Sequence, residues 1–221
     1  MLEKEYSQKD FSYYGKIRLD VYKLIDDNVN RILDIGCSSG NFAEYLLDQK
    51  RCKEAYGIEL FPEAAKIAET KLTKVYCGAV EDAIKNLPDN YFDIIFFNDV
   101  LEHLVNPEEI LKTVKSKLTE NGKIISSIPN IMYFMVIYRL IMQQDFKYES
   151  SGVMDKTHLR WFTKKSIVRM FNNCGYQIQH MVGNYDKNAI RKKFKIINWL
   201  SGGKINESAY VQWLSVATVQ K

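Results

Sequence analysis

The sequence has little that would divide it, or anchor it in a membrane. Only four of its 221 residues are proline, and no stretch rich in proline, glycine or serine separates two halves. The longest apolar run, 131–138, is interrupted by Arg139 and is far shorter than the ~20 residues of a membrane-spanning helix. The first ten residues contain several charges of both signs and no apolar run, so we expect neither a secretory signal nor a membrane anchor. We therefore predict a single globular domain over 1–221.

Metal-ligand spacing and a strong excess of one charge are also absent. The four cysteines form no C-x-x-C pair, and each lies in or beside an apolar stretch. We therefore expect free thiols, a reducing cytoplasmic location and no metal ion. The net charge of +4 is too small to indicate nucleic-acid binding, and no pattern indicates an oligomeric state.

What is present is an alternation of strand-like and helix-like runs. Five apolar runs predict strands, and a further pair near the C-terminus predicts an antiparallel edge. The strands are expected at 31–35, 54–60, 73–80, 91–100 and 123–129, and the pair at 176–182 and 209–219. Between them, helices are expected at 17–25, after Gly40, from Pro62, from Pro107 to a stop at Asn121-Gly122, and over 163–172. This order predicts an α/β domain with a mostly parallel sheet.

Two segments lie outside the alternation, at about 130–161 and 184–208. Loops of this length are usually functional or flexible, and both follow strands that point toward the ligand edge of the sheet, so we interpret them as lids. Ile131 to Met142 is compatible with an amphipathic lid helix, a lipid- or partner-binding patch, or core. The basic run from Lys187 to Lys195 is compatible with a solvated helix face, or with attraction of a phosphorylated or lipid-linked substrate or an anionic membrane.

The stretch RILDIGCSSGNF, residues 31–42, predicts a buried strand, a glycine turn and a helix. A dinucleotide loop of the form G-x-G-x-x-G would have its second glycine at Ser38, and Gly40 comes one residue too early. Asp34 would repel a phosphate at this turn, but it would attract an ammonium or sulfonium group. Glu59, at the end of the next predicted strand, is spaced to accept hydrogen bonds from a ribose diol. The pattern predicts a nucleoside ligand with a cationic tail.

These residues resemble the first two cofactor motifs of class I S-adenosylmethionine-dependent methyltransferases, in the metabolite branch (type 11/12-like). The resemblance covers roughly 17–182. It implies a Rossmann-like, doubly wound fold with a seven-stranded, mostly parallel sheet, an antiparallel edge strand and lid insertions. It also implies S-adenosylmethionine as cofactor and S-adenosylhomocysteine as product.

The resemblance assigns cofactor contacts along the chain. Ala79 stands where the family often has an acid for the adenine amino group, and Glu81 or Asp82 is a substitute acceptor. NDVLEHL, from Asn98, matches the fourth motif of the metabolite branch and lacks the N/D-P-P-Y/F sequence of enzymes that methylate DNA bases, so no nucleic acid is expected. The cofactor-binding residues implied are Asp34, Gly36, Cys37, Gly40, Asn41, Phe42, Glu59, Leu60, Ala79, Val80, Glu81, Asn98 and Tyr14.

Two histidines are candidates for catalysis. His158 lies in DKTHLRWFT, where Asp155, Arg160 and Trp161 are candidate substrate-binding residues; an imidazole there can take a hydroxyl proton, or the segment can simply cap and pack the next helix. His103 is a second candidate base or a structural anchor. We predict methyl transfer to an oxygen, less readily a nitrogen, of a small or lipid-linked metabolite, with peripheral membrane contact compatible with the sequence. The alternatives are a noncatalytic cofactor-binding module and an NAD-dependent oxidoreductase.

Overall fold

A seven-stranded sheet organises the protein, whose computed structural model describes residues 17–185 and 192–220. The strand order is β3-β2-β1-β4-β5-β7-β6, and the seven-stranded, mostly parallel sheet is the one that the resemblance implied. β1 to β5 run parallel, and β7 is antiparallel to both of its neighbours. The strands are β1 (Arg31–Ile35), β2 (Glu54–Glu59), β3 (Lys74–Cys77), β4 (Phe92–Asn98), β5 (Leu118–Pro129), β6 (Tyr176–Tyr185) and β7 (Tyr210–Val219).

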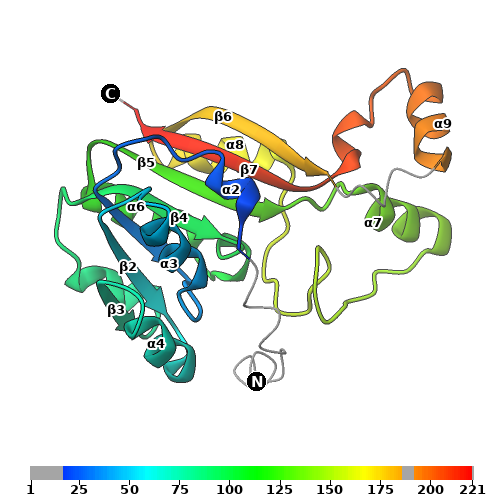
Figure 1. Ribbon diagram of the computed structural model, residues 1–221. Helices are drawn as coiled ribbons and strands as arrows, with labels where there is room; N and C mark the ends of the chain where they lie inside the picture. The colour runs from blue at the N-terminus through cyan, green and yellow to red at the C-terminus, as the bar shows by residue number, and fades with distance from the viewer. Residues whose placement is uncertain (1–16, 186–191, 221) are drawn as a thin grey trace.

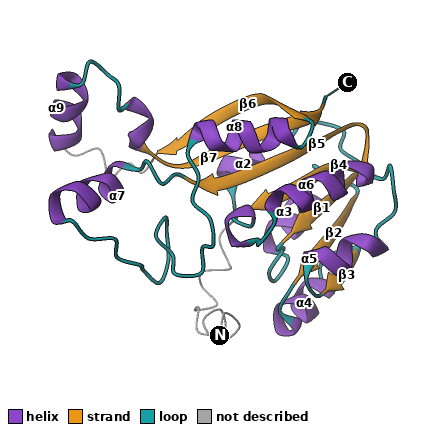
Figure 2. Ribbon diagram, turned by 180° about the vertical axis from the view of Figure 1, so that it is seen from behind, coloured by secondary structure: helices purple, strands orange, loops and turns teal. Residues whose placement is uncertain are grey.

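Helices cover both faces of the sheet (Figures 1 and 2). One face packs on α2 (Leu19–Tyr22), α3 (Asn41–Asp48) and α4 (Pro62–Glu69), and the other on α5 (Val80–Ala83), α6 (Pro107–Val114) and α8 (Lys164–Asn173). Central strand β4 supplies Ile94 and Phe96 to the first layer and Ile95 and Phe97 to the second. All four side chains are buried, which explains why this strand is apolar almost throughout rather than alternating.

Two predicted boundaries differ from the structure. The helix expected over 17–25 is reduced to α2, although Val21 and Ile25 are buried as its apolar spacing predicted. Helix α6 ends at Val114 and a 3-10 turn, η4 (Lys115–Lys117), leads into β5 at Leu118, so Asn121-Gly122 lies inside a strand instead of ending a helix. The register of β5 on β4 shifts between Phe92 and Ile94, and a Cβ on Gly122 would lie 2.9 Å from the Phe92 carbonyl oxygen. The glycine therefore permits a close backbone approach at an irregular pairing.

The two insertions lie together at the β5, β7 and β6 end of the sheet (Figure 1). The first contains α7 (Phe134–Tyr138) and the π-helical turn η5 (Arg139–Gln143); the second contains α9 (Lys192–Leu200) and reaches into η6 (Asn206–Ala209). The rings of Phe134 and Phe194 pack edge to face with centroids 5.2 Å apart. Within the described ranges, no helix has the length and apolar content needed to cross a membrane. The lid role of both insertions stays a prediction.

Candidate cofactor and acceptor site

The turn between β1 and α3 has left-handed backbone at three of its positions. Gly36, Ser38 and Gly40 have φ values of 73°, 50° and 76°. A Cβ on Gly36 would lie 2.7 Å from Cγ2 of Val100, so this position tolerates no side chain without movement of the loop after β4. The backbone N–H groups of Gly36 and Cys37 both donate to the carbonyl of Ile58, at 2.8 and 3.1 Å, which joins the turn to the end of β2.

Glu59, the predicted ribose ligand, holds this turn from the end of β2. Its Oε2 accepts from the backbone N–H of Ser38 at 2.7 Å, and its Oε1 accepts from the N–H of Phe61 at 2.9 Å. Burial raises the pKa of the carboxyl, and these backbone donors oppose the rise. Each carboxylate oxygen has a further lone pair, so bonds to the loop leave capacity for a diol. The sequence identified the acid without indicating its second task, holding the loop.

Asp34 is a buried acid with an unmet acceptor. Asp34 is 3% exposed, and its Oδ1 has no hydrogen-bond partner among the described residues. Burial and the negative charge of Glu59 raise the pKa of Asp34 to about 7, against opposing effects of Asn98 and Arg18. A buried carboxylate without a partner is costly, and a ligand cation would compensate it.

A network that sequence reasoning missed fixes the chain just after β4. Asp99 has a φ of 56°, and its carboxylate accepts from the side chains of Arg18, Ser127 and Gln212. Arg18 also bonds Asp20 at 3.0 Å and donates to Ser127 Oγ at 2.8 Å. The three partners of Asp99 lie 28 to 113 residues away along the chain, so local spacing carried no signal for them.

The remaining predicted cofactor residues separate into positions after the ends of strands and positions in the core. Leu60 is 49% exposed at the end of β2, and Ala79, Val80 and Glu81 follow β3, with Val80 buried and Glu81 exposed. Phe42 instead packs in the core, 5.4 Å from the ring of Phe96, and Cys37 is buried as well.

Two further predicted contacts lie near the N-terminus and at the start of α3. Asn41 accepts a bond from Lys71 through Oδ1. Tyr14 lies outside the described residues.

Beyond β4 the structure brings the two predicted histidines together. The turn η3 (Leu101–His103) follows β4 directly, and its Glu102 carbonyl accepts from the N–H groups of Leu159 and Arg160 at 2.9 and 3.1 Å. The rings of His103 and His158 lie with centroids 4.8 Å apart. His158 Nε2 is 3.9 Å from Oε1 of Glu102, and one ligand atom from each of the three residues lies within 4.8 Å of the others. Burial and Asp99 raise the pKa of Glu102 well above its usual range.

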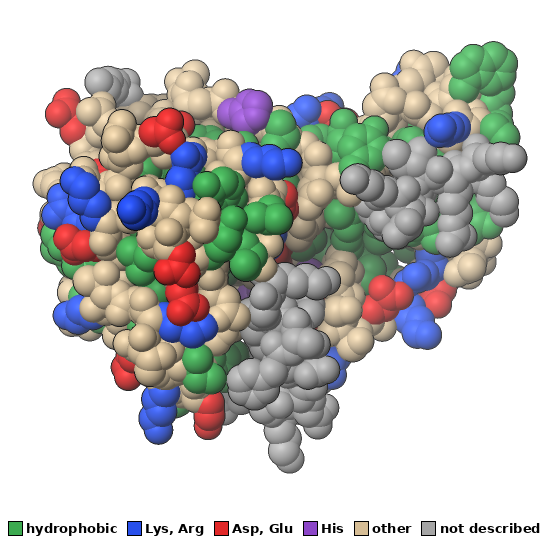
Figure 3. All heavy atoms as spheres, viewed as in Figure 1, with side chains coloured by type: hydrophobic (Ala, Val, Ile, Leu, Met, Phe, Trp, Pro, Cys, Tyr) green, Lys and Arg blue, Asp and Glu red, His purple; other side chains and the backbone are tan. Residues whose placement is uncertain are grey.

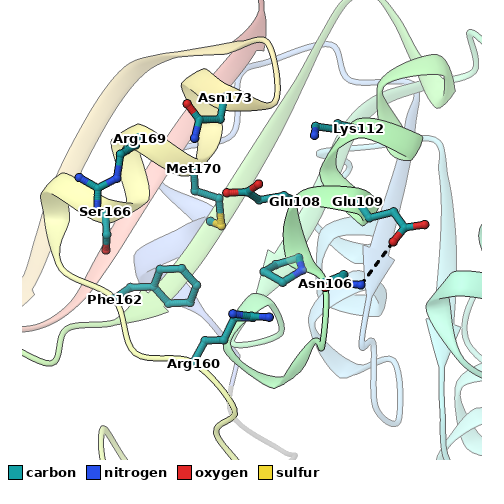
Figure 4. Close-up of a pocket in the computed structure, with 11 residues that line it drawn as sticks. Asn106, Glu108, Glu109, Lys112, Arg160, Phe162, Ser166, Arg169, Met170 and Asn173 are labelled. Carbon is teal, nitrogen blue, oxygen red and sulfur yellow. Dashed lines mark hydrogen bonds between the residues drawn. The ribbon is translucent and has the colours of Figure 1, made fainter.

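The predicted substrate residues do not share one surface. Asp155 is buried and accepts from the backbone N–H and the hydroxyl of Thr157 at 2.9 and 2.7 Å. Arg160 points instead into a groove of about 640 Å³ between α6 and α8, where it bonds the Val105 carbonyl (Figure 4). Trp161 packs against Phe146 and Tyr148, with centroids 5.8 and 5.9 Å away. Its buried Nε1 lacks an acceptor among the described residues.

Comparison with known sequences identifies relatives of this chain. A family model described as a methyltransferase domain matches residues 8–181. The mitochondrial ubiquinone biosynthesis O-methyltransferase of Saccharomyces cerevisiae is 29% identical over 164 residues, which cover 66% of this chain and 53% of that protein. The ubiquinone biosynthesis O-methyltransferase of Xylella fastidiosa is 31% identical over 130 residues, covering 56% and 52%. The chain thus spans about half the length of the curated relatives it matches.

Solved structures support the same fold at low identity. A SAM-dependent methyltransferase from Archaeoglobus fulgidus has a TM-score of 0.65 and 20% identity, with 90% of each chain covered. A possible histamine N-methyltransferase from Thermotoga maritima has a TM-score of 0.62 and 17% identity, with 96% of this chain and 90% of that chain covered. The cyclase SpnF has a TM-score of 0.60 and 16% identity, with 90% and 79% covered. Because two of these proteins are described as methyltransferases and the third as a cyclase, the shared fold does not by itself select the reaction.

Proposed function

Because this chain belongs to the S-adenosylmethionine-dependent methyltransferases, we propose that it transfers the methyl group to an oxygen, rather than a nitrogen, of a small or lipid-linked metabolite. The observation that carries the proposal is the pair of imidazoles, His103 and His158, which meets directly after the strand whose end is Asn98. The turn that carries His103 follows β4, and the glycine turn follows β1. These two strands are neighbours in the sheet. The cytoplasmic location and the single-domain organisation stay predictions from the sequence.

Residues at the ends of β1, β2 and β3 would bind the cofactor. Asp34 offers its unmet carboxylate oxygen to the ammonium of the methionine part, and Glu59 offers its remaining lone pairs to the ribose. Gly36 lets the ligand approach the backbone closely. Exposed Leu60 and the backbone around Ala79 and Val80 supply an apolar wall for adenine.

The acceptor side supports oxygen as the atom methylated. The sulfonium already makes the methyl group electrophilic, so the protein mainly aligns the acceptor and excludes water. An amine with a free lone pair needs no base, whereas an aliphatic or phenolic hydroxyl reacts faster as its anion. His158 is 7% exposed and faces Glu102, a position suited to a group that holds or withdraws a hydroxyl proton. The names of the two O-methyltransferase relatives are compatible with this choice.

The apolar surface of the insertions supports a lipid-linked acceptor or membrane contact. Ile141 and Met142 in η5 are 65% and 67% exposed, and Trp199 and Leu200 in α9 are 79% and 70% exposed. Apolar side chains gather at the outer end of the protruding part that carries α9 (Figure 3). Contiguous exposed apolar patches on a protein surface mark sites of contact with a membrane, a ligand or another protein.

A turnover screen tests the function. The full chain is incubated with S-adenosylmethionine and a panel of phenols, catechols, isoprenoid-substituted phenols, alcohols and amines, and both S-adenosylhomocysteine release and product mass are measured. We expect O-methylated products from hydroxyl acceptors. Tight S-adenosylhomocysteine binding without turnover on any acceptor would support a noncatalytic module instead. NADH binding without S-adenosylhomocysteine binding would support an oxidoreductase.

A matched pair of histidine variants tests the imidazoles. His158→Ala should lower kcat for a hydroxyl acceptor by 10²- to 10⁴-fold, the range for loss of acid–base catalysis, while S-adenosylhomocysteine affinity changes little. His180→Ala is the control, because His180 is exposed on β6 and is the remaining histidine of the chain. Unchanged turnover of His158→Ala on a true acceptor would remove His158 from the mechanism.

A further inference from the structure

Glu102 is a buried carboxylate whose charge is not compensated within its own surroundings. The residue is 1% exposed, and neither Oε1 nor Oε2 has a hydrogen-bond partner among the described residues. The nearby acids Asp99 and Asp155 add negative charge, and the neighbouring cation Arg18 is already bonded to Asp99 and Asp20. Burial and the nearby acids favour the protonated form of Glu102 in the empty site, whereas a bound cation would favour the carboxylate.

Both histidines beside Glu102 have a defined tautomer. Nδ1 of His103 lies 3.1 Å from the carbonyl oxygen of Thr157, and Nδ1 of His158 lies 3.1 Å from that of Val153. A carbonyl oxygen only accepts hydrogen bonds, so each Nδ1 carries the proton and each Nε2 carries the lone pair. A histidine that binds a metal ion is typically held in this way, with its other ring nitrogen donating to a backbone carbonyl.

We propose that Glu102, His103 and His158 bind a divalent transition-metal ion of the zinc class. One ligand atom from each residue lies within 4.8 Å of the others. Zinc bonds to nitrogen and oxygen are about 2.1 Å long, so two ligand atoms of a tetrahedral site lie about 3.4 Å apart, and side-chain rotations would bring the three atoms to that separation. Two imidazoles and one carboxylate match the donor preference of zinc, and three protein ligands leave a position open, as in catalytic zinc sites.

A direct proton bridge explains the cluster less well. The 3.9 Å between Nε2 of His158 and Oε1 of Glu102 exceeds hydrogen-bond length, so these two atoms do not share a proton directly. A cation between them would contact both atoms, and it would give Glu102 Oε1 the partner that it lacks among the described residues. Sequence spacing gave no signal for the site, since His158 joins Glu102 and His103 only when its segment docks on η3 through Leu159 and Arg160.

The role of the ion in turnover rests on the proposed function. An acceptor hydroxyl at the open position would have its pKa lowered by the ion, so that oxygen becomes the better nucleophile. His158 would then act as a ligand rather than as a free base. The metal site itself requires neither a cofactor nor an acceptor, and it is tested without them.

The full chain, prepared without a polyhistidine tag and stripped with a chelator, is titrated with Zn²⁺ in a calorimeter and with Co²⁺ in a spectrophotometer. We expect one ion per chain with micromolar or tighter affinity, visible Co²⁺ absorption and a higher melting temperature with Zn²⁺. Glu102→Gln and His158→Ala should each weaken binding at least tenfold. His180→Ala and Cys77→Ser, which alter exposed potential ligands elsewhere, should leave it unchanged.

Two results would overturn the site. One is the absence of sub-millimolar binding of Zn²⁺ and Co²⁺ by the wild-type chain. The other is binding that persists unchanged in Glu102→Gln. Circular dichroism and S-adenosylhomocysteine affinity establish that each variant is folded, and His103→Ala, at a half-buried position, replaces any variant that is not. The metal titration contains no acceptor, so its result does not depend on whether the turnover screen finds a substrate. Conversely, a chain that binds no metal could still be a methyltransferase.

Discussion

The proposed cofactor side and the proposed acceptor side of this protein are held together by different kinds of contact. At the ends of β1 and β2, backbone N–H groups bond to Ile58 and Glu59 and the turn depends on Gly36 and Gly40. Beyond β5, the insertions are joined by aromatic contacts such as Phe134 with Phe194, and α9 leaves Trp199 79% exposed. Backbone geometry permits little change, whereas side-chain surfaces vary freely. The contrast suits an enzyme with a fixed cofactor and a specific acceptor.

The largest effect should come from filling the glycine turn. Gly36→Ala forces a Cβ to within 2.7 Å of Val100 and places alanine at a φ of 73°. We expect at least a hundredfold loss of S-adenosylhomocysteine affinity, equivalent to about 2.7 kcal/mol, measured by calorimetry. Gly152→Ala on the acceptor side is the matched control, since its φ is 82° and a Cβ there meets nothing within 4 Å. Equal affinity losses in both variants would mean that the effect is not specific to the glycine turn.

Removal of Glu59 should have the next largest effect. Glu59→Ala deletes the predicted ribose contact and both bonds that hold Ser38 and Phe61. We expect S-adenosylhomocysteine affinity to fall at least tenfold, or about 1.4 kcal/mol. Glu54→Ala, at the opposite end of β2, is the control and should keep full affinity. Unchanged affinity in Glu59→Ala would refute the ribose contact.

Affinity should also depend on pH through Asp34. With a pKa of about 7 in the empty site, the carboxyl is mostly protonated at pH 6 and mostly ionised at pH 8. A cationic cofactor tail favours the ionised form, so S-adenosylhomocysteine affinity should fall about tenfold from pH 8 to pH 6. Calorimetry at both pH values measures the change. A flat profile in the wild type would contradict the contact between Asp34 and the ammonium.

The same group has the opposite effect on the stability of the empty protein. Its pKa in the unfolded chain is about 4, so the protonated form stabilises the fold. That contribution is fully present below pH 4 and is lost as the pH rises through about 7. Asp34→Asn should therefore remove the pH dependence of affinity and raise the melting temperature of the empty protein at pH 8.

Sequence reasoning succeeded where neighbours along the chain determine the structure. The strand–turn–helix of 31–42 and the helix expected over 163–172 depend on local spacing, and both occur, the second as α8 with Thr163 as its N-cap. Local patterns did not reveal that Gly122 serves an irregular strand pairing, that Arg18 holds Asp99, or that Glu102 meets His158. Each of these depends on residues far apart in sequence whose meeting is decided by sheet topology.

The smallest effect on the cofactor should come from loosening the insertions. Phe194 is 6% exposed and packs on Phe134 and Ala209. These three side chains form a small buried cluster that is separate from the main core. Phe194→Ala should therefore open α7 and α9 locally rather than unfold the chain, because stability varies across a structure in separate units. We expect faster hydrogen exchange over 134–138 and 194–200 and less than a twofold change in S-adenosylhomocysteine affinity, with Ile196→Ala, 58% exposed in the same helix, as an inert control. If Phe194→Ala instead weakened the cofactor as Glu59→Ala should, the two sides would be energetically coupled, and the acceptor surface would be part of the cofactor site rather than a separate layer built beside it.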